Sequence, residues 1–308
     1  MKQNIDKAPT IVVVMSTYNG DKYLSQQLDS LLQQNLVNLS VFVRDDGSSD
    51  KTQEILQKWN TDTNDWLTWY QGENRGPGRS FMEALEKAPD ADYYAFCDQD
   101  DIWDSDKLDV AVSVLESSTK QYKIYTSNVA LSNNDLKIIG NTNFYENTSI
   151  QAAMMYNQAI GCTIVMNKEL REKLIKYNPN YMVMHDCWAY RVCAALGGEL
   201  CFDQVPHIKY RQHDGNFSGG SMSQLELWSK RVKSLFGRKK HMRKWTAEEL
   251  LKGYAGFMPD YCRNIVEEFA HYDSSIKNKW KLLGDKKIYS DSKAGNLGIA
   301  VSIVLGIL

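Results

Sequence analysis

Short hydrophobic runs alternate with segments of helical spacing through the first hundred residues. β-Branched and aromatic residues fill runs that are typical of buried strands, and after the first of them Leu24, Leu28, Leu31 and Leu32 have the spacing of one helix face. The predicted strands are residues 11–15, 39–44, 67–70 and 93–97, and the predicted helices are residues 24–32, 52–59 and 79–87. Strands that alternate with helices favour an α/β fold in which helices cover both faces of a mostly parallel sheet.

The rest of the chain has a less regular pattern. Further strands are predicted at residues 124–129, 162–166 and 208–211, a helix at 186–196, and helices with charged faces beyond residue 221. We therefore expect a catalytic domain over residues 1–220, followed by a helical C-terminal region over residues 221–308.

Polar and acidic residues follow three of the predicted strands. Residues 16–20 read Ser-Thr-Tyr-Asn-Gly, residues 45–50 read Asp-Asp-Gly-Ser-Ser-Asp, and residues 98–101 read Asp-Gln-Asp-Asp. Ligands of open α/β sheets bind outside the carboxyl ends of the strands. The three segments are therefore expected to meet at one binding site.

Asp98 and Asp100 follow an apolar run, and residues two apart in a strand point to the same side. Two carboxylates aimed together indicate a site for Mg²⁺ or Mn²⁺, which can bridge a protein and a diphosphate. The alternative is an acidic loop that caps the next helix, a role that Asp101 or Asp104 also fits.

Two further loops could each bind a ligand or be plain turns. A turn with a helix cap explains residues 47–50 but leaves the adjacent carboxylates of Asp45 and Asp46 unexplained. A carboxylate can accept the N3–H of a uracil or thymine ring, so Asp46 is a candidate nucleoside ligand. In the loop of residues 74–79, Arg75 and Arg79 can hold phosphate oxygens, although a plain strand-to-helix turn explains that loop equally well.

The composition is ordinary for a globular protein, with 43% hydrophobic and 24% charged residues. The six cysteines form no C-x-x-C pair, so we expect buried or half-buried free thiols in a reducing compartment. There is no signal peptide and no apolar run of about 18 residues, which makes the cytoplasm the expected location. Nothing in the sequence points to nucleic acid.

The net charge of −2 hides an uneven distribution. Residues 225–308 have 16 Lys and Arg against 9 Asp and Glu, and eight of these basic residues lie between Lys230 and Lys244. A basic amphipathic segment can lie on an anionic membrane surface, and a solvated helix pair is the alternative. The apolar segment of residues 295–308 is too short to span a bilayer, so it either enters the interface, docks on the body or joins two copies.

Three segments together resemble family 2 glycosyltransferases. They are residues 14–20, residues 44–50 and residues 96–103, the last reading Phe-Cys-Asp-Gln-Asp-Asp-Ile-Trp. The similarity extends over roughly residues 9–220. Within the family, His185-Asp186 and residues 210–213 (Tyr-Arg-Gln-His) resemble bacterial rhamnosyltransferases of cell-wall and capsular polysaccharide synthesis.

The resemblance implies a GT-A fold, which is Rossmann-like, and a divalent metal, Mn²⁺ or Mg²⁺. It also implies inverting transfer of a sugar from a nucleotide-diphosphate donor to a saccharide acceptor that is usually lipid-linked. Residues 1–110 would bind the donor and residues 111–220 the acceptor. A lipid-linked acceptor favours a peripheral position on the inner face of the plasma membrane.

The resemblance also implies roles for single residues. Thr17 and Asp46 match nucleoside contacts, Tyr18 packs near the base, Asp98 matches a position near the ribose and donor sugar, and Asp100 matches the principal metal ligand. Asp186 matches the general base, which in-line attack requires opposite the leaving diphosphate, and a helix N-cap is its alternative. His213 is either a ligand of the metal or diphosphate or a structural residue, and Arg211 is a further candidate for phosphate.

Several functional alternatives stay open at this point. The donor is dTDP-L-rhamnose by resemblance only, because Asp46 suits thymine and uracil alike, and UDP-sugars are the alternative. A phosphatase whose first aspartate is the nucleophile would leave Asp45 and Asp46 unexplained. A non-catalytic nucleotide-sugar-binding subunit would fit the basic tail. The sequence gives no oligomeric state.

Overall fold

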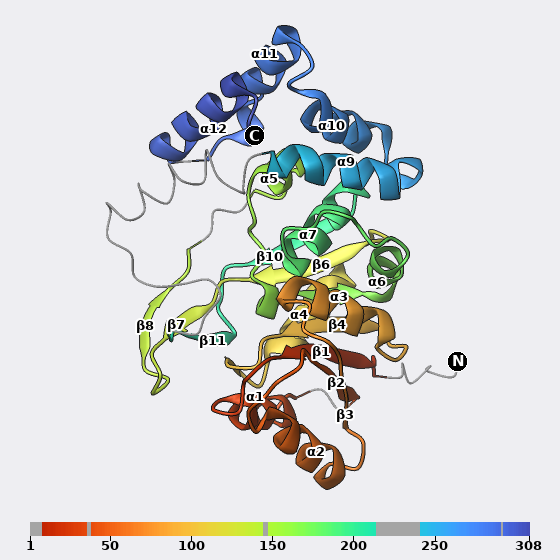
Figure 1. The fold of residues 1–308 in the computed structure, drawn as a ribbon, viewed down its shortest axis with the longest axis vertical. Helices are drawn as coiled ribbons and strands as arrows, with labels where there is room; N and C mark the ends of the chain where they lie inside the picture. The colour runs from red at the N-terminus through yellow and green to blue at the C-terminus, as the bar shows by residue number, and fades with distance from the viewer. Residues whose placement is uncertain (1–7, 36–37, 144–146, 214–240, 291) are drawn as a thin grey trace, which may run out of the picture.

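The computed structural model describes residues 8–35, 38–143, 147–213, 241–290 and 292–308 (Figure 1). Its centre is a seven-stranded sheet in the order β10-β6-β9-β4-β1-β2-β3. The strands are β1 Ile11–Thr17, β2 Leu39–Asp45, β3 Leu67–Gln71, β4 Tyr93–Cys97, β6 Lys123–Ser127, β9 Val165–Asn167 and β10 Glu199–Asp203. Only β9 runs antiparallel to its neighbours, β4 and β6, so the predicted α/β fold with a mostly parallel sheet is confirmed.

Helices cover both faces of this sheet. The first two thirds of the chain provide α1 Leu24–Leu32, α2 Thr52–Asp62, α3 Pro77–Lys87, α4 Lys107–Ser117, α5 Ile150–Met155, α6 Lys168–Ile175 and α7 His185–Ala195. Side chains of β1 alternate between the two hydrophobic clusters: Val12 and Val14 pack with α3 and α7, while Ile11, Val13 and Met15 pack with α1 and α4. The run of β-branched residues is therefore buried on both sides, as a central parallel strand requires.

Some predicted boundaries differ from the observed ones. The strand predicted at residues 162–166 is a 3₁₀ turn, Gly161–Thr163, followed by β9. Helix α4 was not predicted, although its buried residues Leu108, Ala111, Val112 and Leu115 have the spacing of one helix face.

A second, four-stranded sheet lies beside the first, in the order β5-β11-β7-β8. Its strands are β5 Ile102–Trp103, β7 Ala130–Ser132, β8 Ile138–Asn141 and β11 Ile208–Arg211. The pairing of β11 with β5 brings the last predicted strand next to the turn that follows β4. This sheet therefore connects residue 211 to the Asp98–Asp101 segment.

The C-terminal helices are α9 Met242–Tyr254, α10 Asp260–His271, α11 Ile276–Gly284 and α12 Lys293–Leu305. Helices α9 and α10 pack on α5 and α7, and one hydrophobic cluster runs from Val12 through Trp188 and Phe269 to Leu308. The predicted domain boundary near residue 220 lies outside the described residues. Each helix in the described parts of the chain is too short or too polar to cross a bilayer.

Candidate functional site

A cavity of about 390 Å³ opens at the carboxyl ends of β1, β2 and β4. Its lining is Ser16, Tyr18, Asp46, Asn74, Gly76, Pro77, Phe81, Asp98, Gln99, Asp100, Ile160, Gly161, Met184, His185, Asp186 and Tyr210. It therefore brings together Tyr18, Asp46, Asp98, Asp100 and Asp186 from the predicted set. A wider concavity on the outer face of α2 contains none of the predicted residues.

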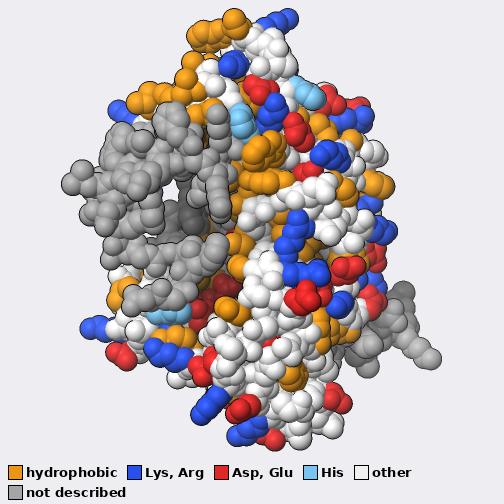
Figure 2. Space-filling view, viewed as in Figure 1, with side chains coloured by type: hydrophobic (Ala, Val, Ile, Leu, Met, Phe, Trp, Pro, Cys, Tyr) orange, Lys and Arg blue, Asp and Glu red, His pale blue; other side chains and the backbone are white. Residues whose placement is uncertain are grey.

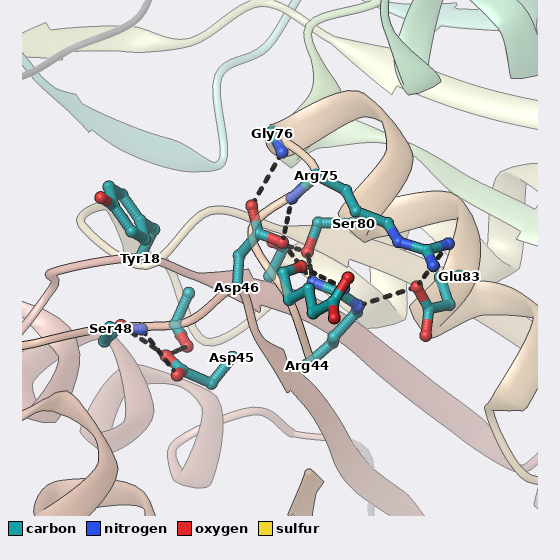
Figure 3. A network of polar contacts seen from close by, with 12 residues as sticks. Tyr18, Arg44, Asp45, Asp46, Ser48, Arg75, Gly76, Ser80 and Glu83 are labelled. Carbon is teal, nitrogen blue, oxygen red and sulfur yellow. Dashed lines mark hydrogen bonds and ion pairs between the residues drawn. The ribbon is translucent and has the colours of Figure 1, made fainter. Parts of the chain in front are cut away.

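Asp46 is held by a buried polar network (Figure 3). Its Oδ1 accepts hydrogen bonds from the Arg44 guanidinium and from the Arg75 amide at 2.9 Å, and its Oδ2 accepts one from the Gly76 amide at 2.9 Å. A carboxylate oxygen can accept two hydrogen bonds. Among the described residues, Oδ2 therefore keeps one acceptor position, on a residue that lines the cavity.

The neighbouring carboxylate, Asp45, faces away from the cavity. It is fully buried and accepts hydrogen bonds from the Thr17 hydroxyl at 3.0 Å, the Ser48 amide at 2.9 Å and the Gln53 side chain at 2.9 Å. Arg44 thus compensates the charge of Asp46, and hydrogen bonds from Thr17, Ser48 and Gln53 compensate that of Asp45. The structure does not bring the predicted nucleoside contact Thr17 into the cavity lining, because its buried hydroxyl is bound to Asp45.

The Asp98–Asp100 segment is a turn rather than a strand, since β4 ends at Cys97. The alternation argument behind the metal prediction was therefore wrong for these residues, although both carboxylates line the cavity. Gln99, between them, joins the turn to the end of β1: its Oε1 accepts from the Tyr18 amide at 2.9 Å and its Nε2 donates to the Tyr18 carbonyl at 3.1 Å. A Cβ atom on Gly20 would lie 2.2 Å from that Oε1, which explains the glycine.

Arg211 supports this turn from the second sheet. Its buried guanidinium donates to the Asp100 carbonyl at 2.9 Å, the Asn134 carbonyl at 2.6 Å and Gln26 Oε1 at 2.8 Å, and its amide donates to Asp101 Oδ1 at 3.1 Å. These contacts occupy the side chain that was predicted to bind phosphate. Among the described residues, the guanidinium bonds the Asp100 backbone to the second sheet.

His213 lies next to the acidic turn. Its Nε2 is 2.8 Å from Asp100 Oδ2, and its ring packs on Tyr23 with a centroid separation of 5.0 Å. His213 and Asp100 are 113 positions apart in the sequence. The tertiary structure thus places His213 within reach of a cation held by Asp100.

Asp186 lines the cavity from the first turn of α7. Its Oδ2 accepts a hydrogen bond from Asn157 Nδ2 at 3.0 Å. The N-cap position belongs to Met184, so Asp186 is not the N-cap residue, although its Oδ1 accepts a hydrogen bond from the Cys187 amide at 2.6 Å in the first turn. Sequence reasoning missed Asn157, because only the fold brings the segment before the 3₁₀ turn to the start of α7.

His185 is buried beside Asp186, which excludes the solvent-facing alternative. Its ring stacks on Phe81 with centroids 4.0 Å apart and meets the edge of Phe96 at 4.7 Å. Burial lowers the pKa of His185 from 6.5 to about 4, and Asp186 opposes this shift only in part. The imidazole is therefore neutral near pH 7 and forms, with Phe81, an apolar part of the cavity wall.

Arg79 points away from the cavity. Its guanidinium donates to Asn178 Oδ1 at 2.5 Å and to the Pro179 carbonyl at 2.7 Å, and its side chain lines a separate hollow. The structure therefore ties α3 to the loop before α7 through Arg79 and does not bring this predicted phosphate ligand to the site.

Comparison with known proteins identifies the family. The model for "Glycosyl transferase family 2" matches residues 12–195, more than half of the chain. The protein belongs to glycosyl transferase family 2. The matched segment contains all five of the predicted residues that line the cavity.

The individual relatives share about a third of their residues or fewer with this chain. The dTDP-rhamnosyl transferase RfbG of Shigella flexneri is 29% identical over 222 residues, 68% of this chain and 75% of its own. The putative teichuronic acid biosynthesis glycosyltransferase TuaG of Bacillus subtilis is 34% identical over 101 residues, 33% of this chain and 40% of its own.

Solved structures confirm the GT-A fold. TarS of Staphylococcus aureus in complex with UDP-GlcNAc superimposes with a TM-score of 0.59, covering 97% of this chain and 82% of that one at 18% identity. The mannosyltransferase PcManGT of Pyrobaculum calidifontis, in complex with GDP-Man and Mn²⁺, gives a TM-score of 0.53, with coverage of 98% and 81% at 18% identity. At such identity the likeness concerns the fold alone.

The acidic turn of this glycosyltransferase fits a divalent cation. Enclosure by protein atoms raises the pKa of Asp98, and the like charges of Asp100 and Asp186 add to the shift. A cation between such carboxylates would relieve their repulsion. Asp98, Asp100 and His213 offer oxygen and imidazole ligands that suit Mn²⁺ or Mg²⁺, whereas the buried group of Asp98, Asp101 and Cys162 includes a thiol, which hard cations do not prefer.

None of the six cysteines lines the cavity. All six cysteines are free, four of them buried and two half-buried, as predicted. Burial raises the pKa of Cys97 and Cys162, so both remain protonated thiols that fill the core behind the turn.

Proposed function

We propose that the protein is an inverting, metal-dependent glycosyltransferase that moves L-rhamnose from dTDP-L-rhamnose to a saccharide acceptor in bacterial surface polysaccharide synthesis. The observation that carries the proposal is that Asp186 lines the same cavity as Asp98 and Asp100. A base and a diphosphate site in one cavity are the two parts that in-line displacement at the anomeric carbon needs.

In this mechanism Asp186 accepts the proton of the acceptor hydroxyl. The acceptor oxygen forms its bond to the anomeric carbon as the bond from that carbon to the diphosphate oxygen breaks, which inverts the configuration. Asn157 orients the Asp186 carboxylate through its hydrogen bond to Oδ2. Asp98, Asp100 and His213 would hold the cation, which when bound neutralises charge on the departing diphosphate.

Recognition of the nucleoside is assigned to Asp46 and Tyr18. The remaining acceptor position on Asp46 Oδ2 suits the N3–H of thymine or uracil. The Tyr18 ring is half exposed beside it and offers a stacking surface for the base.

The choice of dTDP-L-rhamnose rests on the similarity to RfbG. A UDP-sugar is the second candidate, because the remaining acceptor position on Asp46 suits uracil as well as thymine. A lipid-linked saccharide acceptor would place the enzyme at the cytoplasmic face of the plasma membrane.

The test uses purified full-length protein with dTDP-L-rhamnose, UDP-GlcNAc, UDP-glucose or GDP-mannose in the presence of Mn²⁺ or of EDTA. The true donor should raise the melting temperature and be hydrolysed slowly in Mn²⁺ but not in EDTA. Stabilisation and turnover with GDP-mannose alone would contradict the assignment of Asp46. Unchanged activity in EDTA would contradict the metal.

Substitutions of Asp186 and Asp100 separate the transfer step from donor binding. Asp186→Asn should keep donor-dependent stabilisation and lose transfer by a factor of about 10² or more, whereas Asp100→Asn should lose both. Asp109→Asn, which changes an exposed carboxylate of α4, is the matched control. Wild-type protein that binds donor but shows no transfer to any lipid-linked or soluble acceptor would indicate a non-catalytic binding subunit instead.

A further inference from the structure

Helices α11 and α12 present an exposed hydrophobic surface at one end of the molecule (Figure 2). It consists of Ile276, Trp280, Leu297, Val301, Val304 and Leu305, which we call the α11–α12 apolar face. Trp280 is 68% exposed and Ile276 is 75% exposed. Figure 1 places both helices at the end of the long axis, away from the main sheet.

The spacing of these residues shows that the face is a regular feature of both helices. Ile276 and Trp280 lie four positions apart on α11, and Leu297, Val301, Val304 and Leu305 lie on one side of α12. The other side of α12 is docked, because Ile299 and Ile303 are buried in the main core. Helix α12 is therefore anchored to the body through one side and leaves the other side exposed.

Contacts between the helices fix the face. Lys279 Nζ donates to the Val304 carbonyl at 2.8 Å, and the Leu308 amide donates to the Tyr272 hydroxyl at 2.8 Å. The C-terminal end of α12 is thus tied to α11 and to Tyr272, which follows α10. The apolar side chains are held on an ordered surface, where a hydrophobic area of this kind usually marks an interaction site.

The segment that forms the face has a positive charge balance, although Lys281 is paired with Glu268 of α10. Residues 276–308 have six lysines and two aspartates. Lys293 lies one turn before Leu297 on the same side of α12, and Lys277 lies next to Ile276 on α11; both lysines are exposed. Lysine at the edge of an apolar surface, with a tryptophan within it, is typical of a helix that lies in a lipid interface.

We propose that the α11–α12 apolar face docks on an anionic lipid bilayer, with its hydrophobic residues in the acyl boundary and its lysines on the headgroup phosphates. A second copy of the chain fits this face less well. A symmetric pair would bring the same lysines of both copies together, and lysine is depleted from protein interfaces. Anionic headgroups would instead neutralise these charges.

The proposal is independent of the donor sugar and of catalysis. The experiment measures flotation of the full-length protein with phosphatidylcholine vesicles, with and without phosphatidylglycerol. Wild-type protein should float with the anionic vesicles, and binding should fall as the salt concentration rises. Failure of the wild-type protein to bind either kind of vesicle would overturn the proposal.

Variants locate the contact. The double substitution of Trp280→Ser and Val301→Ser should lower binding at least about tenfold, and Lys277→Gln with Lys293→Gln should lower it about fivefold for each lysine. Val205→Ser changes an exposed aliphatic residue outside these helices and is the control. Surface substitutions are preferable to removal of residues 295–308, because that removal would also take Ile303 and Leu308 from the core.

Two readouts distinguish the outcomes. Donor hydrolysis in solution should stay unchanged in all these variants, so a loss of flotation would not arise from a damaged active site. Variants that bind anionic vesicles like the wild-type protein would overturn the proposal. So would a wild-type dimer that the Trp280→Ser and Val301→Ser variant converts to a monomer without any change in vesicle binding.

Discussion

Two neighbouring residues at the start of α7 have different functions because their surroundings differ. His185 is buried between Phe81 and Phe96, while Asp186 lines the cavity and receives a hydrogen bond from Asn157. The sequence places an ionisable pair there but does not show that only one of them is accessible. Burial keeps the imidazole neutral, so it leaves the charge of the cavity to the carboxylates.

The low pKa of His185 predicts a dependence of stability on pH. Above pH 6.5 the residue is neutral in both the folded and the unfolded chain and has no effect. As the pH falls from 6.5 toward about 4, only the unfolded chain takes up the proton, so the free energy of unfolding decreases by up to about 3 kcal/mol. His185→Phe should therefore lose less stability than the wild-type protein between pH 7 and pH 4.

Urea unfolding at several pH values measures this difference. His271→Gln changes an exposed histidine and should keep the wild-type dependence. Equal pH dependence in the wild-type protein and in His185→Phe would show that the imidazole is accessible to solvent in the folded state.

The contacts of Arg211 in the second sheet predict that its substitution weakens metal binding at Asp100. Arg211→Lys keeps the charge but cannot make all the contacts of the planar guanidinium to the Asp100 carbonyl, Asn134 and Gln26. We expect about tenfold weaker Mn²⁺ affinity and a loss of about 1–3 kcal/mol in the free energy of unfolding. Titration of Mn²⁺-dependent thermal stabilisation measures the affinity.

The control for this prediction is Arg171→Lys. Arg171 also donates to several backbone carbonyls, those of Leu85, Glu86 and Ala88 on α3 and after it, and it does not line the cavity. Its substitution should lower stability without weakening Mn²⁺ binding. If both variants lose Mn²⁺ affinity equally, the effect is one of global stability and not of the Asp100 turn.

At the scale of elements, the cavity depends on how the loop after β1 meets the turn after β4. The Gln99 side chain bonds both backbone groups of Tyr18, and Gly20 leaves the space for it. Each segment was predicted from its own polar residues and from the rule that strand ends face one site. The contact between them could not be predicted, because nothing in the sequence around Gln99 indicates that its side chain bonds a tyrosine 81 residues away.

Gly20→Ala should disrupt this contact without unfolding the protein. The added Cβ would displace the flexible end of Gln99, so the two hydrogen bonds to Tyr18 would be lost and donor affinity would decrease, while stability would fall by only about 1 kcal/mol. Gln99→Ala should have the same effect. The double variant should be no weaker than either single one, because all three remove the same interaction.

Donor-dependent thermal shifts of the four proteins complete this cycle. Gly78→Ala, in which the new Cβ would lie at least 3.4 Å from its neighbours at the opposite end of the cavity, is the control glycine. Additive losses of donor affinity from Gly20→Ala and Gln99→Ala would show that the two residues act separately.

At the scale of the whole molecule, the C-terminal helices share the core of the catalytic fold. Residues of α9 and α10, among them Leu250 and Phe269, belong to the same hydrophobic cluster as Trp188 and Val192 of α7. Half-buried Arg243 donates to the Met155 carbonyl at 3.0 Å, and Lys244 pairs with Asp273 at 2.7 Å. These two are the members of the predicted basic segment that the structure describes fully, and both are bonded within the protein.

A chain that ends at residue 213 is therefore expected not to fold cooperatively. Its α7 would expose the apolar side that α9 and α10 cover, so the fragment should bind a hydrophobic dye and be cleaved rapidly by protease at concentrations that leave the full chain intact. Circular dichroism with thermal unfolding provides the measurement. A sharp unfolding transition of the fragment would instead support an independent catalytic domain over residues 1–220.

The sequence by itself determined the strands and helices from β1 to β4, the acidic strand ends and the family, because these depend on local periodicity and on motifs that are continuous in the chain. The tertiary structure decided which side chains reach the cavity. Thr17, Arg79 and Arg211 have the chemistry of ligands but are bound to protein partners, whereas His213 reaches Asp100 from a different sheet. Partner choice depends on contacts between residues far apart in the chain, and local patterns do not contain that information.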